Sequence, residues 1–219
     1  MIVERYITRP RHVEVQVVGD KHGSVIELGT RECSVQRRYQ KLVEEAPAPN
    51  LPASTETGLR TAAVRLAASI GYDSTGTVEF VVDDETGDYF FLEMNTRLQV
   101  EHPVTEEITG LDLVELQLRA AASLPLAVGD IAFSGHAIEA RINAEDAAAG
   151  FVPQTGTVTV VSPPTNARWD AAIEIGTPIT PHYDPMVAKL IVHGANRQAA
   201  ISNLGEALEN LLILSLIHI

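Results

Sequence analysis

The chain contains 219 residues, of which 45% are hydrophobic, and this is enough to bury the core of one large domain or two small ones. Its formal net charge of −13 argues against a nucleic-acid-binding surface, and no apolar run is long enough to span a membrane. Cys33 is the only cysteine, which excludes intrachain disulfides and multi-cysteine zinc sites. Together with the absence of a signal-peptide pattern, it favours a cytoplasmic protein.

The first elements are a predicted β-hairpin and a helix. Valines alternate with polar residues over 12–17, a turn bounded by glycines follows, and residues 25–28 are apolar, which predicts the hairpin. After a proline-rich stretch, the apolar spacing predicts a helix that is capped by Ser54 or Thr55 and runs to Ile70.

A local basic cluster lies inside this acidic chain. It consists of Arg31, Arg37, Arg38 and Lys41. Such a cluster is either a solvated face or a site for phosphate or another small anion, and the sequence leaves both interpretations open.

Residues 77–93 predict a second hairpin with its turn centred on Thr86. This register places Glu79 directly opposite Glu93, with Asn95 one step further on the same face. Opposed like charges destabilise a sheet unless a proton or a divalent cation lies between them, and hard oxygen ligands suit magnesium or manganese. The sequence therefore predicts a metal site here, although a slip of one residue would separate the two glutamates.

Polar and less polar residues alternate strictly from position 93 to position 101. If this segment is one extended strand, its polar side chains share one face. A half-exposed structural strand would alternate in the same way, but its polar face would carry no set of catalytic groups. The predicted functional face consists of Glu93, Asn95, Arg97, Gln99 and Glu101.

The remaining elements form a second, initially strand-rich part. A helix is predicted over 112–122, and the looser stretch over 125–135 is the predicted domain boundary. Beyond it, the pattern predicts strands over 137–142, 156–161 and 187–192 and a helix over 197–212.

Several motifs in the right order resemble biotin carboxylase over about residues 3–212. They are residues 11–16, 33–38, 44–49, 93–97, 100–103, 135–145 and 182–186. The resemblance implies an α+β chain, with the C-terminal portion of an ATP-grasp fold over 1–124 and a biotin carboxylase C-terminal domain over 134–213. Residues 214–219 depart from the family pattern and are interpreted as a non-native tail.

The resemblance also implies the chemistry. A carbon–nitrogen ligase of this kind carboxylates biotin on a carrier protein, using bicarbonate, ATP and Mg²⁺ or Mn²⁺, through carboxyphosphate. The implied partners are a biotin carboxyl carrier protein or domain and a carboxyltransferase, with a homodimer for the complete protein and with neither nucleic acid nor membrane. The Gly-rich lid and nucleotide-binding lysines of the family would lie upstream of residue 1, so we expect an incomplete fragment that is inactive alone.

Matching positions give the implied site residues. Those for ATP are Glu4, Arg5, Ile7, His12, Gln36, Tyr39, Glu79, Val81 and Glu93, and those for the metal are Glu79, Glu93 and Asn95. Those for bicarbonate are Lys41, Arg97, Gln99, Val100 and Glu101, with Glu101 as general base and Arg97 gripping an oxyanion. The implied biotin residue is Arg141, which is catalytic together with Arg97 and Glu101.

Some observations keep other interpretations open. Tyr39 stands where the family often has a histidine near the ribose, and the pattern around Arg141 alone predicts a structural ion pair. The alternatives are another bicarbonate-activating ATP-grasp ligase, such as a carbamoyl-phosphate synthetase, and a truncated, non-catalytic module that binds partner proteins. The region of Arg141 argues against the first of these.

Overall fold

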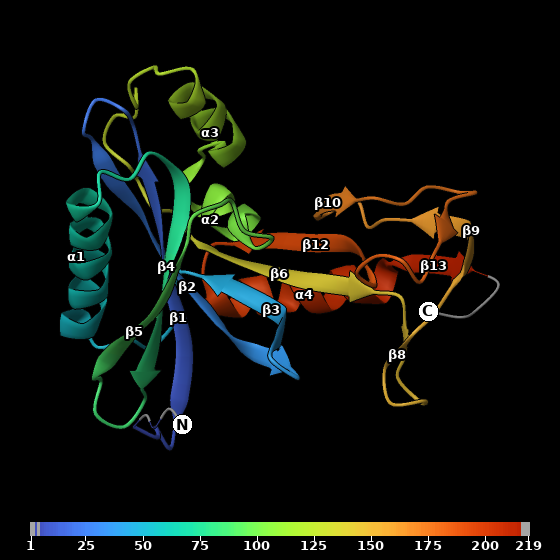
Figure 1. The fold of residues 1–219 in the computed structure, drawn as a ribbon. Coiled ribbons are helices and arrows are strands. Elements are labelled where there is room, and N and C mark those ends of the chain that lie inside the picture. The colour runs from blue at the N-terminus through green and yellow to red at the C-terminus, as the bar shows by residue number, and fades with distance from the viewer. Residues whose placement is uncertain (1–2, 4, 216–219) are drawn as a thin grey trace.

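An antiparallel sheet of eight strands runs through the molecule (Figure 1). The computed structural model describes residue 3 and residues 5–215. The sheet has the strand order β10-β12-β6-β3-β2-β1-β4-β5. Its strands are β1 (Pro10–Gly19), β2 (Val25–Arg37), β3 (Gln40–Ala46), β4 (Ser74–Asp83), β5 (Tyr89–Asn95), β6 (His136–Asn143), β10 (Arg168–Ala171) and β12 (Met186–Gly194).

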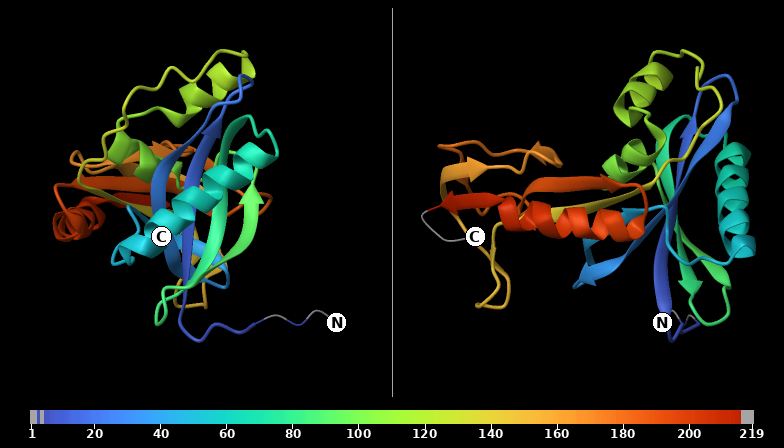
Figure 2. Two further views of the ribbon diagram at one scale, coloured as in Figure 1. Left: turned by 90° about the vertical axis from the view of Figure 1, so that its left-hand side faces the viewer. Right: turned by 180° about the vertical axis from the view of Figure 1, so that it is seen from behind.

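Helices cover the sheet from both sides. Among the described residues the helices are α1 (Ala53–Ser69), α2 (His102–Thr109), α3 (Leu113–Ala121) and α4 (Arg197–Asn210). Helix α1 packs on the valines of β1 and on β4, and α4 packs on β6 and β12 further along the same face. Helix α2 packs on the opposite face, and the views in Figure 2 show the strong twist of the sheet between α1 and α4.

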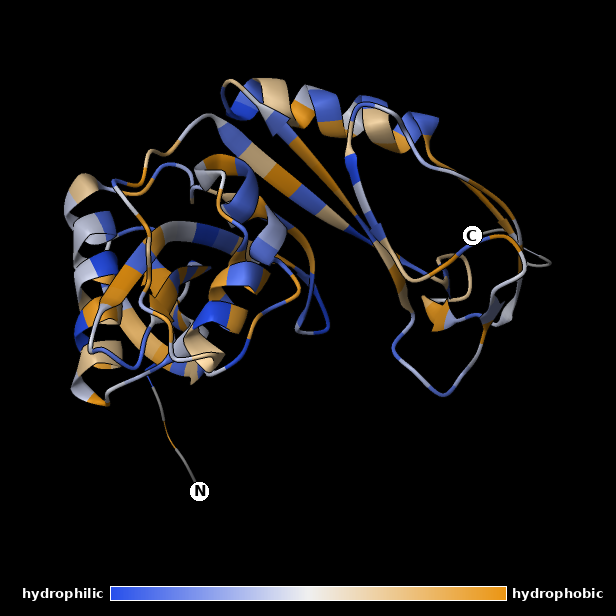
Figure 3. Cartoon of the chain, turned by 90° about the horizontal axis from the view of Figure 1, so that it is seen from above, coloured by the Kyte–Doolittle hydropathy of each residue, from blue (hydrophilic) through white to orange (hydrophobic). Residues whose placement is uncertain are grey.

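Alternation along the strands decides what each face carries, and Figure 3 shows it as bands of opposite hydropathy. Val13, Val15 and Val17 are fully buried against α1. Glu14 and Gln16 lie between them and are also fully buried, but on the face of α2. A buried polar face of this kind requires partners for every charge, which the site described below supplies.

The smaller strands lie beyond β6 and β12. They are β7 (Glu145–Asp146), β8 (Val152–Pro153), β9 (Gly156–Ser162), β11 (Pro178–Ile179) and β13 (Leu212–Ser215). Strand β13 pairs with β9, so Leu214 and Ser215 of the predicted tail are part of a sheet, while 216–219 lie outside the described residues. Within the described part of the chain, no helix is both long and apolar enough to cross a membrane.

The predicted α+β class is confirmed, with three corrections to single elements. The predicted strand over 93–101 ends at Asn95, and α2, which was not predicted, begins at His102. Helix α1 has Pro52 at its N-cap, without a side-chain cap, and Thr55 instead donates a hydrogen bond to the Gly87 carbonyl. The last helix ends at Asn210 because the chain turns into β13.

Candidate active site

A cavity of about 470 Å³ opens on the polar face of the sheet. Strands β1, β2, β3, β4, β5 and β6 all contribute to its lining, together with the segment before α2 and the loop before β12. The lining residues are His12, Gln36, Tyr39, Gln40, Lys41, Glu79, Glu93, Asn95, Arg97, Gln99, Val100, Glu101, Arg141, Asn143, Asp184, Pro185 and Met186.

The predicted opposition of two glutamates is confirmed. Glu79 of β4 pairs with Glu93 of β5, although the register shifts between Phe80 and Glu79. Because of that irregularity Phe80 pairs with Phe91, one residue away from the register expected for a turn centred on Thr86. The shift therefore restores the pairing of the two carboxylates.

The donor set around these glutamates fits a divalent cation. Asn95 bridges them, since its Nδ2 donates to Oε1 of Glu79 and to Oε1 of Glu93 at 3.1 Å each. Burial alone would raise the pKa of Glu79, but His12, Lys41 and Gln99 together lower it to about 2. Glu79 is therefore ionised at neutral pH, and rotation of the Asn95 amide would present a third oxygen to a hard cation.

His12 presents a defined tautomer to this cluster. Gln36 Nε2 lies 3.1 Å from His12 Nδ1, and His12 Nε2 lies 2.8 Å from Glu79 Oε2. Since the Gln36 amide nitrogen can only donate, Nδ1 accepts and the proton of a neutral ring lies on Nε2, the ring nitrogen nearer to Glu79.

Glu79 should make the metal-free protein less stable in acid. Its folded-state pKa is lowered from the ordinary value of 4.5 to about 2. Its contribution is therefore fully present above pH 4.5 and is lost as the pH falls from about 4.5 through about 2. We expect about 2 kcal/mol of the free energy of unfolding to depend on this carboxylate, allowing for partial solvent screening. Urea unfolding with a chelator at about pH 6 and about pH 3, with the Glu79→Gln protein as reference, would show a steeper acid loss for the original chain.

The segment after β5 brings the other predicted groups to the cavity through a turn, because the strand has already ended. Gln99 and Glu101 are buried, and Gln99 Nε2 donates to Glu79 Oε1 at 2.7 Å. Arg97 stays exposed and donates to Asn95 Oδ1 at 3.3 Å. The five polar side chains therefore do line one cavity, for a different reason from the one predicted.

Glu101 lies between two cations. Lys41 Nζ donates to its Oε1 at 2.5 Å, and Arg141 donates to its Oε2 at 3.0 Å. Burial alone would raise the pKa of Glu101, but the charges of Lys41 and Arg31 hold it below its usual value. The carboxylate is therefore ionised, and both cations face the cavity beside it.

The predicted basic cluster does not exist as one surface. Arg31 is fully buried and donates to five side chains from β1, β4, the turn before α2 and α2 itself. They are Glu14, Gln16, Thr77, Gln99 and Thr105. Arg37 pairs with Glu145 and lies over the Phe151 ring, while Arg38 lies in the β2–β3 turn with a positive φ of 51°. The four side chains come from β2, from the turn after it and from β3, and the pairing of β2 with β3 is irregular. Of the four, only Lys41 lines the cavity.

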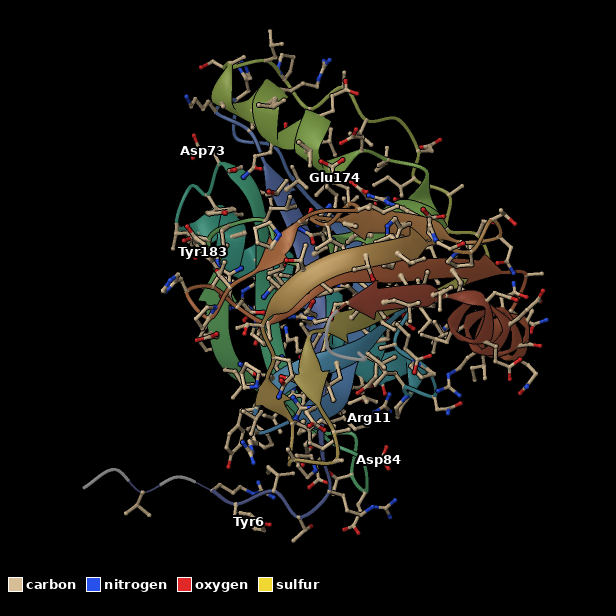
Figure 4. All side chains as sticks on the ribbon, turned by 90° about the vertical axis from the view of Figure 1, so that its right-hand side faces the viewer. Tyr6, Arg11, Asp73, Asp84, Glu174 and Tyr183 are labelled. Carbon is tan, nitrogen blue, oxygen red and sulfur yellow. The ribbon has the colours of Figure 1, made fainter. Side chains whose placement is uncertain are left out.

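The nucleotide residues implied by the resemblance are placed in two groups. His12, Gln36, Tyr39, Glu79 and Glu93 line the cavity. Val81 pairs with His12 on the same face as Glu79, next to the cavity. Arg5 lies instead over the Phe90 ring, and Figure 4 shows its neighbour Tyr6 at the lower edge of the molecule. Ile7 is half-buried, and Glu4 lies outside the described residues.

The charged groups behind the cavity were not predicted. Glu14 Oε2 accepts from Lys41 at 2.7 Å, Glu44 Oε1 accepts from Arg141 at 2.7 Å, and Lys189 donates to the Val100 carbonyl at 2.7 Å. A charged residue between two apolar residues on a strand, as at positions 14 and 139, was the available signal. It shows burial of a charge but does not identify the partner.

The sequence of this chain matches two family models in order. One is described as the ATP-binding domain of the carbamoyl-phosphate synthase L chain and matches residues 1–128. The other is described as the biotin carboxylase C-terminal domain and matches residues 139–218.

Known proteins show the same combination. The alpha component of mitochondrial methylcrotonoyl-CoA carboxylase from Arabidopsis thaliana is 52% identical over 96% of this chain and 29% of its own length. The propionyl-CoA carboxylase alpha chain of Ruegeria pomeroyi is 46% identical over 96% of this chain and 34% of its own length. The chain thus spans less than half the length of these relatives.

A solved structure agrees with the fold in detail. The biotin carboxylase domain of 2-oxoglutarate carboxylase from Hydrogenobacter thermophilus, a dimer in complex with MgADP, ADP and bicarbonate, has a TM-score of 0.92 and 47% identity. The match covers 97% of this chain and 48% of that chain. With both family models, the close relatives and the fold in agreement, this chain belongs to the biotin carboxylase family.

Proposed function

We propose that this chain supplies the bicarbonate, metal and biotin groups of an enzyme that carboxylates biotin at the expense of ATP, through carboxyphosphate. The observation that carries the proposal is the position of Glu101 between Lys41 and Arg141. A carboxylate that can accept a proton lies there beside two cations that can hold an anion, and Lys41 also donates to Glu79 Oε1 at 3.1 Å, which links this group to the Glu79–Glu93 pair in the same cavity.

Bicarbonate fits the Glu101 end of the cavity. An anion bound beside Glu101 would take over hydrogen bonds that Lys41 and Arg141 now give to the carboxylate. The pKa of Glu101, now held low by its cationic neighbours, would then rise and make it a stronger base toward the bicarbonate proton. Arg97 at the rim can grip an oxygen of the same anion.

ATP and the metal fit the part of the cavity around Glu79 and Glu93. Glu79, Glu93 and Asn95 would hold Mg²⁺ or Mn²⁺, and His12, Gln36 and Tyr39 lie on the nucleotide side. When bound, the cation neutralises charge on the phosphoryl group that is transferred. The 2-oxoglutarate carboxylase domain is in complex with MgADP, ADP and bicarbonate, which supports the binding of a metal–nucleotide and bicarbonate by one domain of this family.

Arg141 is the residue we assign to biotin. Its guanidinium is held by Glu44 on one side and Glu101 on the other, at the end of β6 that faces the cavity. In that position it can stabilise negative charge that develops on the ureido oxygen of biotin. The biotin would arrive on a carrier protein or domain. A carboxyltransferase would then transfer the carboxyl group to its final acceptor, in an assembly whose carboxylase part is a dimer.

We further propose that residues 1–124 and 134–213 are the two domains of this chain.

The test is fixation of radiolabelled bicarbonate into biotin by the gene product that carries this chain. Label that depends on ATP, Mg²⁺ and biotin together is the expected result, with the Glu101→Gln protein as the blank. Label that appears without biotin, or none in the complete gene product, would exclude the proposed reaction.

Glu93→Gln should raise the Mg²⁺ concentration that gives half-maximal activity by about 10- to 100-fold, because one anionic oxygen ligand is lost. The measurement is a Mg²⁺ titration of the initial rate at saturating ATP. Glu85→Gln, in the turn of the same hairpin and half-exposed, is the matched control and should leave the titration unchanged. An equal Mg²⁺ requirement in the Glu93→Gln protein would remove Glu93 from the metal site.

A further inference from the structure

Glu139 of β6 is a buried carboxyl group without a hydrogen-bond partner among the described residues. Its exposed fraction is 0%, and neither Oε1 nor Oε2 has a hydrogen-bond partner among the described residues. On its face of the sheet it lies between Ala137 and Arg141, and its partner across the ladder to β12 is Ile191. Ala137 belongs to the apolar cluster that packs against α2, whereas Arg141 lines the cavity. Glu139 therefore lies between that cluster and the cavity. An ionised carboxylate in this place would carry a large desolvation cost.

A second buried carboxyl group lies directly opposite. Glu44 of β3 pairs with Glu139 in the register of β3 and β6, and it is also fully buried. Glu44 Oε1 accepts from Arg141 Nε at 2.7 Å, whereas its Oε2 has no partner among the described residues. Of two opposed carboxyl groups only Glu44 thus has a cation in hydrogen-bond contact, and like charges so placed repel each other.

The position of Lys189 distinguishes the two protonation states of Glu139. Its Nζ donates to the backbone carbonyl of Val100 at 2.7 Å but stays 3.9 Å from Glu139 Oε2. A buried ammonium group beside an ionised carboxylate is strongly attracted to it, because attraction is large where water is excluded. Lys189 nevertheless turns to a neutral carbonyl, which is the arrangement that a neutral Glu139 allows.

The charge of the whole network points the same way. The enclosed carboxylates are Glu14, Glu44, Glu79, Glu101 and Glu139, and the enclosed cations are Arg31, Lys41, Arg141 and Lys189. The acids outnumber the cations, and all of them except Glu139 have a cation in hydrogen-bond contact. A proton on Glu139 removes this imbalance.

We propose that Glu139 is kept as a neutral carboxylic acid, which leaves Lys189 free to hold the Val100 carbonyl and so to fix the turn that presents Glu101. Glu139 is then a positioning residue for the bicarbonate end of the cavity, acting through Lys189, and in this role it rests on the function proposed above. The proton also avoids two opposed negative charges where β3 meets β6 beside Arg141.

The charged groups around Glu139 influence the pKa of its carboxyl group. They are Glu44 of β3, Arg141 on its own strand, Lys189 of β12 and Glu101 before α2, with Asp170 of β10 beyond Lys189 at 3.8 Å. Burial is the strongest influence and raises the pKa of Glu139 well above its usual value, Lys189 lowers it, and Glu44 and Glu101 raise it again. Ionisation at high pH would draw Lys189 away from Val100 and loosen the turn.

Infrared spectroscopy of the full chain gives the direct test. A protonated carboxyl group has a carbonyl band that is separate from the bands of carboxylates. We expect this band at neutral pH in the original chain, its loss in Glu139→Gln, and its retention in Glu45→Gln, the residue next to Glu44 on β3, whose carboxylate is paired with Arg197. In Lys189→Met the band should already be present and unchanged. Burial also raises the pKa of Glu44 to about 7, so Glu44→Gln is recorded as well. A band that first appears when Lys189 is removed, or one that is lost in Glu44→Gln and persists in Glu139→Gln, would overturn the proposal.

Thermal unfolding and kinetics provide the second readout. Because the folded-state pKa is raised, Glu139 lowers stability as the pH rises from its unfolded value toward its folded one. The fall in Tm between about pH 6 and about pH 9 should therefore be smaller in Glu139→Gln than in the original chain, and an equal fall would contradict the proposal. In an active preparation, the KM for bicarbonate should rise with pH in the original chain and rise less in Glu139→Gln. The spectroscopic and Tm measurements need no activity, so they separate failure of this inference from failure of the proposed reaction.

Discussion

Replacing Glu101 with glutamine is expected to lower kcat/KM for biotin carboxylation by about a hundredfold to ten-thousandfold, the usual contribution of a positioned general base. Glutamine keeps the shape of the side chain and can still accept a hydrogen bond from Lys41 or Arg141, but it cannot take a proton from bicarbonate. The loss should therefore fall on the rate at saturating bicarbonate more than on its KM.

The control has to separate lost chemistry from a disturbed network. The change leaves Lys41 and Arg141 without the carboxylate that they share, so the free energy of unfolding must be measured on the same protein. Glu115→Gln on α3, an exposed glutamate that pairs only with Arg119 among the described side chains, is the matched substitution and should keep full activity. If Glu101→Gln retains the original rate, the base lies elsewhere in the cavity.

Local patterns predicted most elements of the fold. The helix over 112–122 was found as α3, because Asp112 caps the amide of Glu115 and apolar residues recur at helical spacing. The long strand over 93–101 was wrong because strict alternation continued past the end of the real strand. His102 and Pro103 begin α2, and a proline in the first turn of a helix was the signal that the alternation concealed.

The metal pair shows both what a pattern can predict and what it cannot. A turn centred on Thr86 was enough to place Glu79 opposite Glu93, yet the next pairs toward the turn follow a different register. An irregularity inside a hairpin depends on packing of Phe80 against Tyr89 and Phe91, and no local sequence signal specifies it.

The polar network behind the cavity could not be predicted, because its partners are distant in sequence. Arg31 was assigned to a basic cluster with its chain neighbours, but its partners come from β1, β4, the turn before α2 and α2 itself. Likewise, Glu139 and Glu44 meet only because β6 pairs with β3 across the proposed domain boundary. Contacts of this kind follow from sheet order, which alternation within single strands does not reveal.

Arg31→Met is expected to lower the free energy of unfolding by about 3–5 kcal/mol, the cost of removing one partner from a buried ion pair. Arg31 has an exposed fraction of 0%, and its Nε donates to Glu14 Oε1 at 2.5 Å. Methionine fills similar volume but leaves that oxygen and the side chains of Gln16, Thr77 and Thr105 without their donor. Glu14 keeps Lys41 as a partner, so the protein should still fold, with the loss confined to this network.

Urea unfolding of matched proteins measures this cost and locates it. Arg60→Met removes a guanidinium that pairs with Glu27 at the surface of α1, where its side chain is 35% exposed, and should change the free energy of unfolding by no more than about 1 kcal/mol. The double variant Arg31→Met, Glu14→Gln should recover part of the loss, because the carboxylate left without its strongest partner is then neutral. Equal costs for Arg31→Met and Arg60→Met would mean that water reaches Arg31 and that the charges around Glu101 are held less rigidly than the buried network implies.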